Sequence, residues 1–193
     1  MERDEQRVRF LSLLRPIERD LENYCRRMVF DRRDCEDALQ NAVLRAFRAF
    51  DRYHDDASFR AWMFKILTNE IFAMNRKRGR IAEFEVAVEP EEMEEFAGLG
   101  FAGEMPISWE TLADALDEEL LAALQNLNDS ERAVLVMRAI GELRYREISE
   151  CLSIPLGSVM GNLSRARQKM RDAILRARRP RHVPQSRDGR SLR

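Results

Sequence analysis

Hydrophobic residues recur at spacings of three and four along two parts of this chain, which is the pattern of amphipathic α-helices. In the first part, the pattern predicts helices over residues 8–28, 35–50 and 59–78. In the second part, it predicts helices over residues 111–127 and 129–140, and then two further helices joined by a tight turn, of which the first is short. We therefore expect an all-α fold made of two small helical domains.

The first predicted helix has a broad apolar face interrupted by a proline. The face consists of Val8, Leu11, Leu14 (or Arg15), Ile17 (or Glu18), Leu21, Tyr24, Cys25 and Met28. Pro16 has no backbone N–H, so it either kinks this helix or marks a restart. Asp34 is placed to cap the second helix, and Gly79 is placed to end the third.

The last two predicted helices have the pattern of a helix-turn-helix. Tyr145, Ile148 and Leu152 share one face of the first helix, and Pro155 must end it. The buried stripe of the second helix is formed by Val159, Leu163, Ala166, Met170 and Ile174. The opposite side carries Gly161, Ser164, Arg165 and Gln168, with Arg167, Lys169 and Arg171 around it. This spacing also fits an ordinary solvated helix, but the Pro155–Gly157 turn and the cations favour a helix that enters a DNA major groove.

Charge is distributed very unevenly along the chain, although the net charge is only −1. Residues 81–131 contain 15 acidic residues and no Lys or Arg. All 33 basic residues lie outside that stretch, together with the remaining 19 of the 34 acidic residues, so the rest of the chain carries +14. Two basic blocks are typical of nucleic-acid contact, and the acidic segment between them could repel DNA or shield the basic faces.

The middle and the end of the chain differ in composition from the predicted helices. Residues 81–110 are acidic and contain Pro90 and Pro106, which indicates a flexible linker. Asn128 and Glu131 have the spacing of a capping box at the start of the helix over residues 129–140. Residues 177–193 are rich in Arg and poor in apolar residues, which predicts a disordered basic tail.

Composition excludes several classes of protein. No apolar run approaches the ~20 residues that span a membrane, and the charged start MERDEQRVRF has no apolar signal core, so we expect a cytoplasmic protein without membrane insertion. The three Cys and two His are widely spaced and include no CxxC pair, so we expect no metal and no cofactor. Because no catalytic motif is present, we expect that the protein is not an enzyme.

Two clusters in the first part suggest contact surfaces. The helix over residues 35–50 presents Glu36, Asp37, Gln40 and Asn41 on its outer side. Acids in a first turn complement the helix dipole, but this does not account for the two amides, so the patch would suit a basic protein partner. Six aromatic residues lie between Phe47 and Phe64, beside cations. Such a mixture can stack single-stranded bases, although most of these rings are expected in the core.

The residues of both parts resemble one family. Residues 34–80, DCEDALQNAVLRAFRAFDRYHDDASFRAWMFKILTNEIFAMNRKRGR, resemble region 2 of the extracytoplasmic-function (ECF) sigma factors of bacterial RNA polymerase. Residues 124–171, LQNLNDSERAVLVMRAIGELRYREISECLSIPLGSVMGNLSRARQKMR, resemble their region 4. The resemblance implies a region 2 helical bundle over residues 1–80, an acidic linker over 81–110, a region 4 helix-turn-helix over 111–176, and a tail over 177–193.

The resemblance also implies roles for individual residues. Its polymerase-binding patch corresponds to Asp34, Glu36, Asp37, Gln40 and Asn41. Its surface for opening the −10 element and holding a flipped-out base corresponds to Tyr53, His54, Ser58, Phe59, Arg60, Trp62, Lys65, Asn69, Arg76, Lys77 and Arg78. Its surface for the −35 element corresponds to Arg144, Tyr145, Arg146, Ser158, Met160, Gly161, Asn162, Ser164, Arg165, Arg167 and Lys169.

The sequence departs from the family in the helix that reads the −35 element. The family commonly has GTVxSRLxRAR, often with a basic residue at the first x, whereas this chain has GSVMGNLSRAR. Met160, Gly161 and Asn162 thus stand where the family often has a basic residue, Ser and Arg. An altered −35 sequence or a lower duplex affinity is expected, because Arg pairing with guanine contributes ~1–3 kcal/mol of discrimination.

The function implied is that of a sigma factor, which binds core RNA polymerase at the β′ clamp and the β flap and directs it to promoter DNA. Many relatives are held inactive by an anti-sigma factor, so such a partner is a further expectation, although the sequence identifies none. The alternative is a helix-turn-helix transcriptional regulator that acts without polymerase. That alternative requires a dimer interface, for which no apolar stripe is left over.

Overall fold

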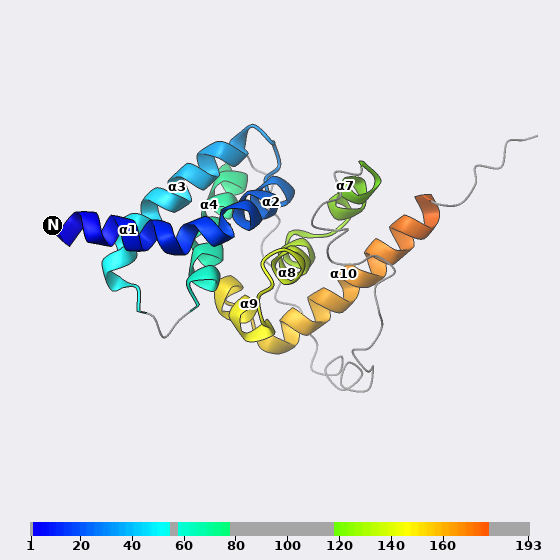
Figure 1. Ribbon diagram of the computed structural model, residues 1–193. Coiled ribbons are helices and arrows are strands. Elements are labelled where there is room, and N and C mark those ends of the chain that lie inside the picture. Colours follow the sequence, from blue (N-terminus) through cyan, green and yellow to red (C-terminus); the bar gives the residue numbers. More distant parts are fainter. Residues whose placement is uncertain (1, 55–57, 78–117, 178–193) are drawn as a thin grey trace, which may run out of the picture.

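The computed structural model describes residues 2–54, 58–77 and 118–177, and every regular element in these residues is helical (Figure 1). The first part contains α1 (Glu2–Leu14), the 3₁₀ turn η1 (Arg15–Ile17), α2 (Glu18–Met28), α3 (Asp34–Ala49), the 3₁₀ turn η2 (Phe50–Arg52) and α4 (Phe59–Lys77). The second part contains α7 (Glu118–Gln125), α8 (Asp129–Ala139), α9 (Tyr145–Leu152) and α10 (Leu156–Ala177). The all-α prediction is confirmed. The predicted linker, the basic tail, Arg78 and Gly79 lie outside the described residues.

Pro16 marks a restart of the helix, because α1 ends at Leu14 and α2 begins after the 3₁₀ turn. Since a 3₁₀ turn has 3.0 residues per turn, it shifts the phase of the apolar face between the two helices. The prediction that Val8 and Leu11 belong to the buried face was wrong, as they are 66% and 37% exposed. Phe10, which the predicted apolar face did not include, is buried against the rings of Phe47, Phe50 and Phe59.

The predicted cap of α3 was also wrong. Asp34 lies in the first turn of the helix and is buried, while the N-cap position belongs to Arg33, which makes no side-chain cap bond. Asp31 instead accepts from the backbone, its carbonyl from the N–H of Asp34 at 2.9 Å and its Oδ1 from the N–H of Arg33 at 3.0 Å. The turn before the helix therefore satisfies these donors, and Asp34 enters the helix itself.

The helix-turn-helix forms as predicted, with one unpredicted feature in its turn. Ser153 ends α9 in the left-handed conformation, with φ 55°. The carbonyl of Pro155 accepts from the N–H of Val159 at 3.2 Å, so Pro155 immediately precedes the first turn of α10. The predicted stripe is buried from Val159 to Met170, whereas Ile174 is half-buried. The capping box of Asn128 and Glu131 at the start of α8 is confirmed.

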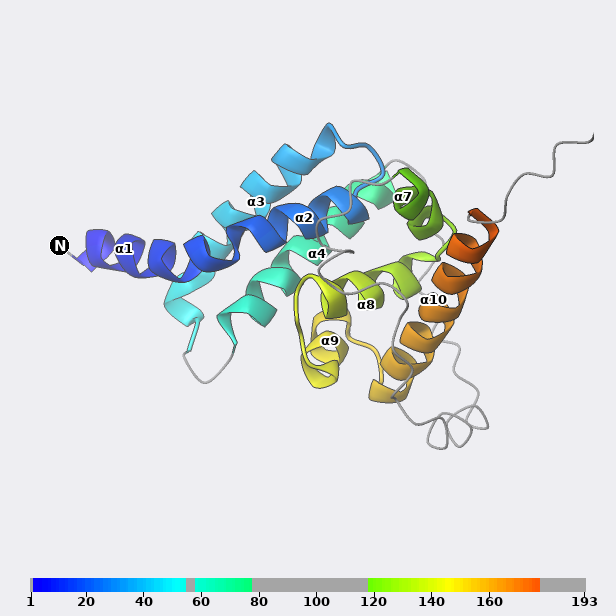
Figure 2. The ribbon, with the colours of Figure 1, turned by 45° about the vertical axis from the view of Figure 1, so that its right-hand side comes forward.

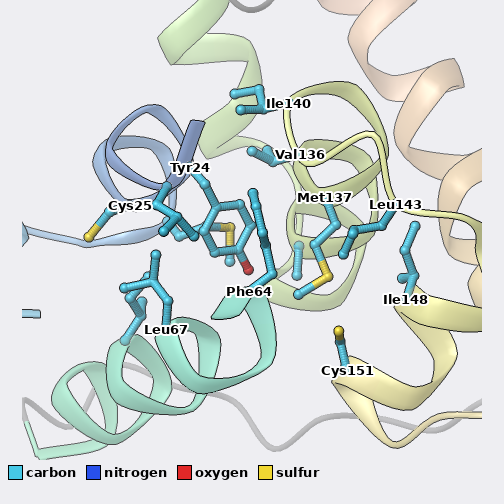
Figure 3. Close-up of a cluster of buried hydrophobic side chains, with 14 of the residues drawn as sticks. Tyr24, Cys25, Phe64, Leu67, Val136, Met137, Ile140, Leu143, Ile148 and Cys151 are labelled. Carbon is cyan, nitrogen blue, oxygen red and sulfur yellow. The ribbon is translucent and has the colours of Figure 1, made fainter. Parts of the chain in front are cut away.

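The two parts share one continuous core. α4 packs against α9 and α2 packs against α8, as Figures 1 and 2 show. At the centre, Tyr24 and Phe64 from the first part face Met137 and Cys151 from the second (Figure 3). The ring centroids of Tyr24 and Phe64 lie 5.1 Å apart, and the Tyr24 hydroxyl lies 2.8 Å from the hydroxyl of Thr68. Both of these buried hydroxyls therefore have a hydrogen-bond partner, and Thr68 also donates to the carbonyl of Phe64 at 2.6 Å.

The junction also depends on polar contacts with the backbone and on one glycine. Arg60 donates to the carbonyl of Gly141 at 3.3 Å and to the carboxylate of Asp20 at 2.8 Å. The Cys151 thiol donates to the carbonyl of Ala61 at 3.2 Å. A Cβ at position 141 would lie 2.9 Å from the Phe64 ring and 2.6 Å from the Met137 carbonyl. Only glycine therefore allows the loop after α8 to approach α4 this closely.

Candidate nucleic-acid and polymerase interfaces

The outer face of α3 presents an acidic and amide-rich surface. Glu36, Asp37, Gln40 and Asn41 are exposed there, and Gln40 donates to Glu36 at 3.1 Å. Asp34, which was grouped with them from sequence, is buried. Leu44, one turn further along the same face, is 53% exposed and was missed, although its spacing from Asp37 and Asn41 could have revealed it. We call Asp37, Gln40, Asn41 and Leu44 the α3 stripe.

Three of the residues predicted for the −10 element line one cavity between α3 and α4. The cavity has a volume of about 370 Å³ and is lined by Trp62, Lys65 and Asn69 together with Arg45, Ala49 and Ile66. Arg45 forms an ion pair with Glu70, which is buried. The cavity thus combines an aromatic wall, an amide and two cations, which are the groups that a base and its phosphate require. Arg45 and Ala49 were missed, because they come from the other helix.

The aromatic residues around this cavity differ in how deeply they are buried. Phe59 is 8% exposed and belongs to the core, whereas Tyr53 and Trp62 are half-buried. Tyr53 stacks on Phe50 at 5.7 Å between ring centroids. A second group of predicted residues is exposed: His54, Ser58, Lys65, Asn69, Arg76 and Lys77. Ser58 also caps α4, since its Oγ accepts from the N–H of Ala61 at 3.2 Å.

The residues predicted for the −35 element differ in how far they reach the surface. Arg144, Arg146 and Lys169 are exposed, and Tyr145, Met160, Ser164, Arg165 and Arg167 are half-buried. Ser158, Gly161 and Asn162 are buried, because α10 packs against α7, α8 and α9. The structure does not present these three residues to a DNA ligand. The guanidinium of Arg138 lies over the ring of Tyr145, at 5.7 Å from its centroid.

Three buried, weakly acidic groups of the core stay protonated at neutral pH, namely the thiols of Cys25 and Cys151 and the hydroxyl of Tyr24. Desolvation raises the pKa of Cys151 to about 12 and also raises the pKa of Tyr24. A side-chain hydrogen bond with Cys35 raises the pKa of Cys25. Folding raises the pKa values of these three groups. The stability that they contribute in their neutral forms is therefore fully present at pH values below the pKa that each group has in the unfolded chain. For Cys151, that contribution is lost as pH rises from about 9 towards 12.

The described residues were also compared with what a metal site and a membrane-spanning helix require. Within residues 2–54, 58–77 and 118–177, no group of three or more His, Cys, Asp or Glu side chains is arranged to hold a metal ion. None of the helices in that part of the chain combines the length and the apolar character that a membrane crossing requires.

Comparison with known proteins places this chain in a family. Residues 13–81 match Sigma-70 region 2, and residues 117–170 match Sigma-70, region 4. The ECF RNA polymerase sigma factor SigE of Mycolicibacterium smegmatis is 32% identical over 149 residues, which cover 77% of this chain and 54% of SigE. The RNA polymerase sigma factor CnrH of Cupriavidus metallidurans is 31% identical over 138 residues, which cover 71% of each protein.

These regions, in this order, define a sigma factor of the sigma-70 class. Within that class, the chain belongs to the ECF family of RNA polymerase sigma factors. It spans about half the length of curated relatives such as SigE. The sigma factor RpoE of Bartonella quintana, solved in complex with the anti-sigma factor NepR, shares the fold, with a TM-score of 0.63 and 20% identity over 90% of this chain and 98% of that one.

Proposed function

We propose that this protein is a sigma subunit that binds core RNA polymerase and directs it to specific promoters in the cytoplasm. In this proposal, residues 1–80 bind the polymerase and open the −10 element, residues 111–176 read the −35 element, and residues 81–110 and 177–193 serve as linker and tail. The protein performs no catalytic step of its own. The observation that carries the proposal is the cavity between α3 and α4, which joins Trp62, Lys65 and Asn69 beside an exposed α3 stripe.

The α3 stripe is the proposed contact with the polymerase. Its acids and amides can bind a basic partner surface, and Leu44 supplies apolar area that is desolvated on binding. We also propose an anti-sigma partner, because the solved relatives RpoE and CnrH are bound to the anti-sigma factor NepR and to the cytosolic domain of CnrY, respectively. The alternative of a regulator that works without polymerase leaves the whole first part without a role.

Replacing Asp37 and Gln40 together with alanine is expected to weaken binding to core polymerase by at least about tenfold, since two interface side chains at ~0.7 kcal/mol each would suffice. Binding is measured by pull-down and titration of purified core polymerase, and function by run-off transcription from a pool of genomic promoter fragments. Glu18→Ala, which removes an exposed acid from α2, is the matched control. Unchanged transcription by core polymerase in the presence of the wild-type protein would contradict the proposed function.

Trp62→Ala is expected to weaken binding of a single-stranded −10 oligonucleotide by the polymerase-bound protein by about 5- to 150-fold, since stacking contributes ~1–3 kcal/mol per base. The measurement is fluorescence anisotropy with the non-template strand. Phe72→Ala removes another half-buried aromatic ring from α4, outside the cavity, and should leave this affinity unchanged. An equal loss in both variants would show that Trp62 acts through the fold of α4.

The shared core implies that the two parts must separate to read a promoter. The positions in the names −10 and −35 differ by about 25 base pairs, which corresponds to about 85 Å of duplex at about 3.4 Å per base pair. A compact chain of this length has a radius of gyration of only about 16 Å. One compact unit cannot reach both elements, so we propose that the junction between α4 and α9 opens when the polymerase binds.

A further inference from the structure

Glu131 does more than its place in the capping box of α8 requires. Its backbone N–H donates to Asn128 Oδ1 at 2.8 Å, and its Oε2 accepts from the backbone N–H of Asn128 at 3.2 Å. A capping box uses one carboxyl or amide oxygen, and it works at a solvated helix end. Glu131, however, is only 1% exposed. A buried carboxylate is costly unless cations compensate it.

The compensating cations come from the DNA-reading helix. Lys169 donates from Nζ to both carboxylate oxygens of Glu131, at 2.9 and 2.8 Å. The Nε of Arg165 lies 3.7 Å from Oε1 of the same carboxylate. Both cations are among the residues that the sequence predicts as −35 contacts. They are nevertheless directed at α8, while their side chains remain 46% and 35% exposed.

The position of Arg165 depends on two residues at which this chain departs from the family pattern. Its Nη2 donates to Asn162 Oδ1 at 2.9 Å. Its guanidinium lies over Gly161, where the nearest guanidinium nitrogen is 3.5 Å from the position of an added Cβ. An Arg at position 162 would replace this acceptor with a cation, and a larger residue at 161 would occupy the space beside the guanidinium. Gly161 and Asn162, which depart from the family pattern, therefore provide space and a hydrogen-bond acceptor for Arg165 within the protein.

We propose that Glu131 is a positioning residue for the DNA contact of region 4. It holds Lys169 and Arg165 against α8 and so withholds both cations from DNA phosphates, which lowers sequence-independent affinity for duplex DNA. The inference rests on the proposed function, because it deepens the account of the same DNA-reading helix. It concerns binding by the free protein, and it is therefore tested separately from transcription.

The test is the salt dependence of binding to a duplex without promoter elements, measured with the full-length protein. The slope of log K against log[salt] is about −0.9 for each phosphate neutralised. Glu131→Gln keeps a capping-box side chain and removes the charge. It should make the slope steeper by up to about 1.8, because two cations are released. The ratio of specific to non-specific affinity should fall. A change in helix stability alone would not move the slope.

Two further variants sharpen the result. Lys169→Met, introduced into the Glu131→Gln background, should remove about 0.9 from the gain in slope. Asp172→Asn removes one negative charge from α10, where Asp172 accepts from the neutral amide of Gln168 at 3.2 Å, and should not change the slope. An unchanged slope in folded Glu131→Gln would overturn the inference. Promoter-directed transcription by the wild type would still support the proposed function.

Discussion

Replacing Phe64 with alanine is expected to lower the free energy of unfolding by about 3–5 kcal/mol, the usual cost of removing a buried phenylalanine. Phe64 is fully buried, and its ring makes an edge contact with Tyr24 at 5.1 Å. Such a ring pair contributes about 0.5–1.5 kcal/mol beyond burial. The same ring lies against the backbone of Gly141, so its loss weakens both α4 and the junction with the second part.

The effect of Phe64→Ala is measured by urea denaturation, followed by circular dichroism. Phe30→Ala is the matched control, because Phe30 is 63% exposed and its truncation should cost less than about 1 kcal/mol. If the two variants lost similar stability, Phe64 would not be filling a shared core. The wild type is expected to unfold in one transition, since α2, α4, α8 and α9 contribute to the same core.

Periodicity predicted most of the helices, because each has an apolar stripe that repeats within one element. Periodicity gave wrong predictions where the position of a residue depends on a neighbouring element and not on the helix that contains it. Val8 and Leu11 follow the helical spacing but are exposed, because the phase changes at the 3₁₀ turn beyond them. Asp34 is a good capping residue by type. In the structure, however, Asp31 already accepts from the backbone N–H groups of Arg33 and Asp34 in the turn before α3.

The candidate sites show the same limit. Family resemblance selected Trp62, Lys65 and Asn69, which do meet in one cavity, but it could not supply Arg45 from the neighbouring helix. From the sequence alone, Gly161 and Asn162 are interpreted as positions where DNA contacts have been lost. Their partner, Arg165, is revealed only by the way α10 packs on α8. The contact of Cys151 with Ala61 joins residues 90 positions apart, and no spacing rule predicts it.

Cys151 should report the opening of the junction between the two parts. Its thiol is buried against Ala61, and desolvation raises its pKa to about 12. Since only the thiolate reacts, alkylation at pH 8 should be on the order of a thousandfold slower than for a free thiol with a pKa of about 8.5. Separation of α9 from α4 would return Cys151 to water. We therefore expect core polymerase with promoter DNA to accelerate the alkylation of Cys151 by at least about a hundredfold, because the thiol regains both access and an ordinary pKa.

The measurement uses N-ethylmaleimide in timed reactions and peptide mass spectrometry, which resolves the cysteines separately. Cys25 is an internal control, because it is buried between α2 and α3 and not at the junction. It should remain slow in both states, whereas general unfolding would expose both thiols. Phe64→Ala should give partial acceleration at Cys151 without polymerase, since it loosens the same contact. An equal alkylation rate of Cys151 in the free and promoter-bound protein would mean that α4 and α9 stay together, and it would overturn the proposed opening of the junction.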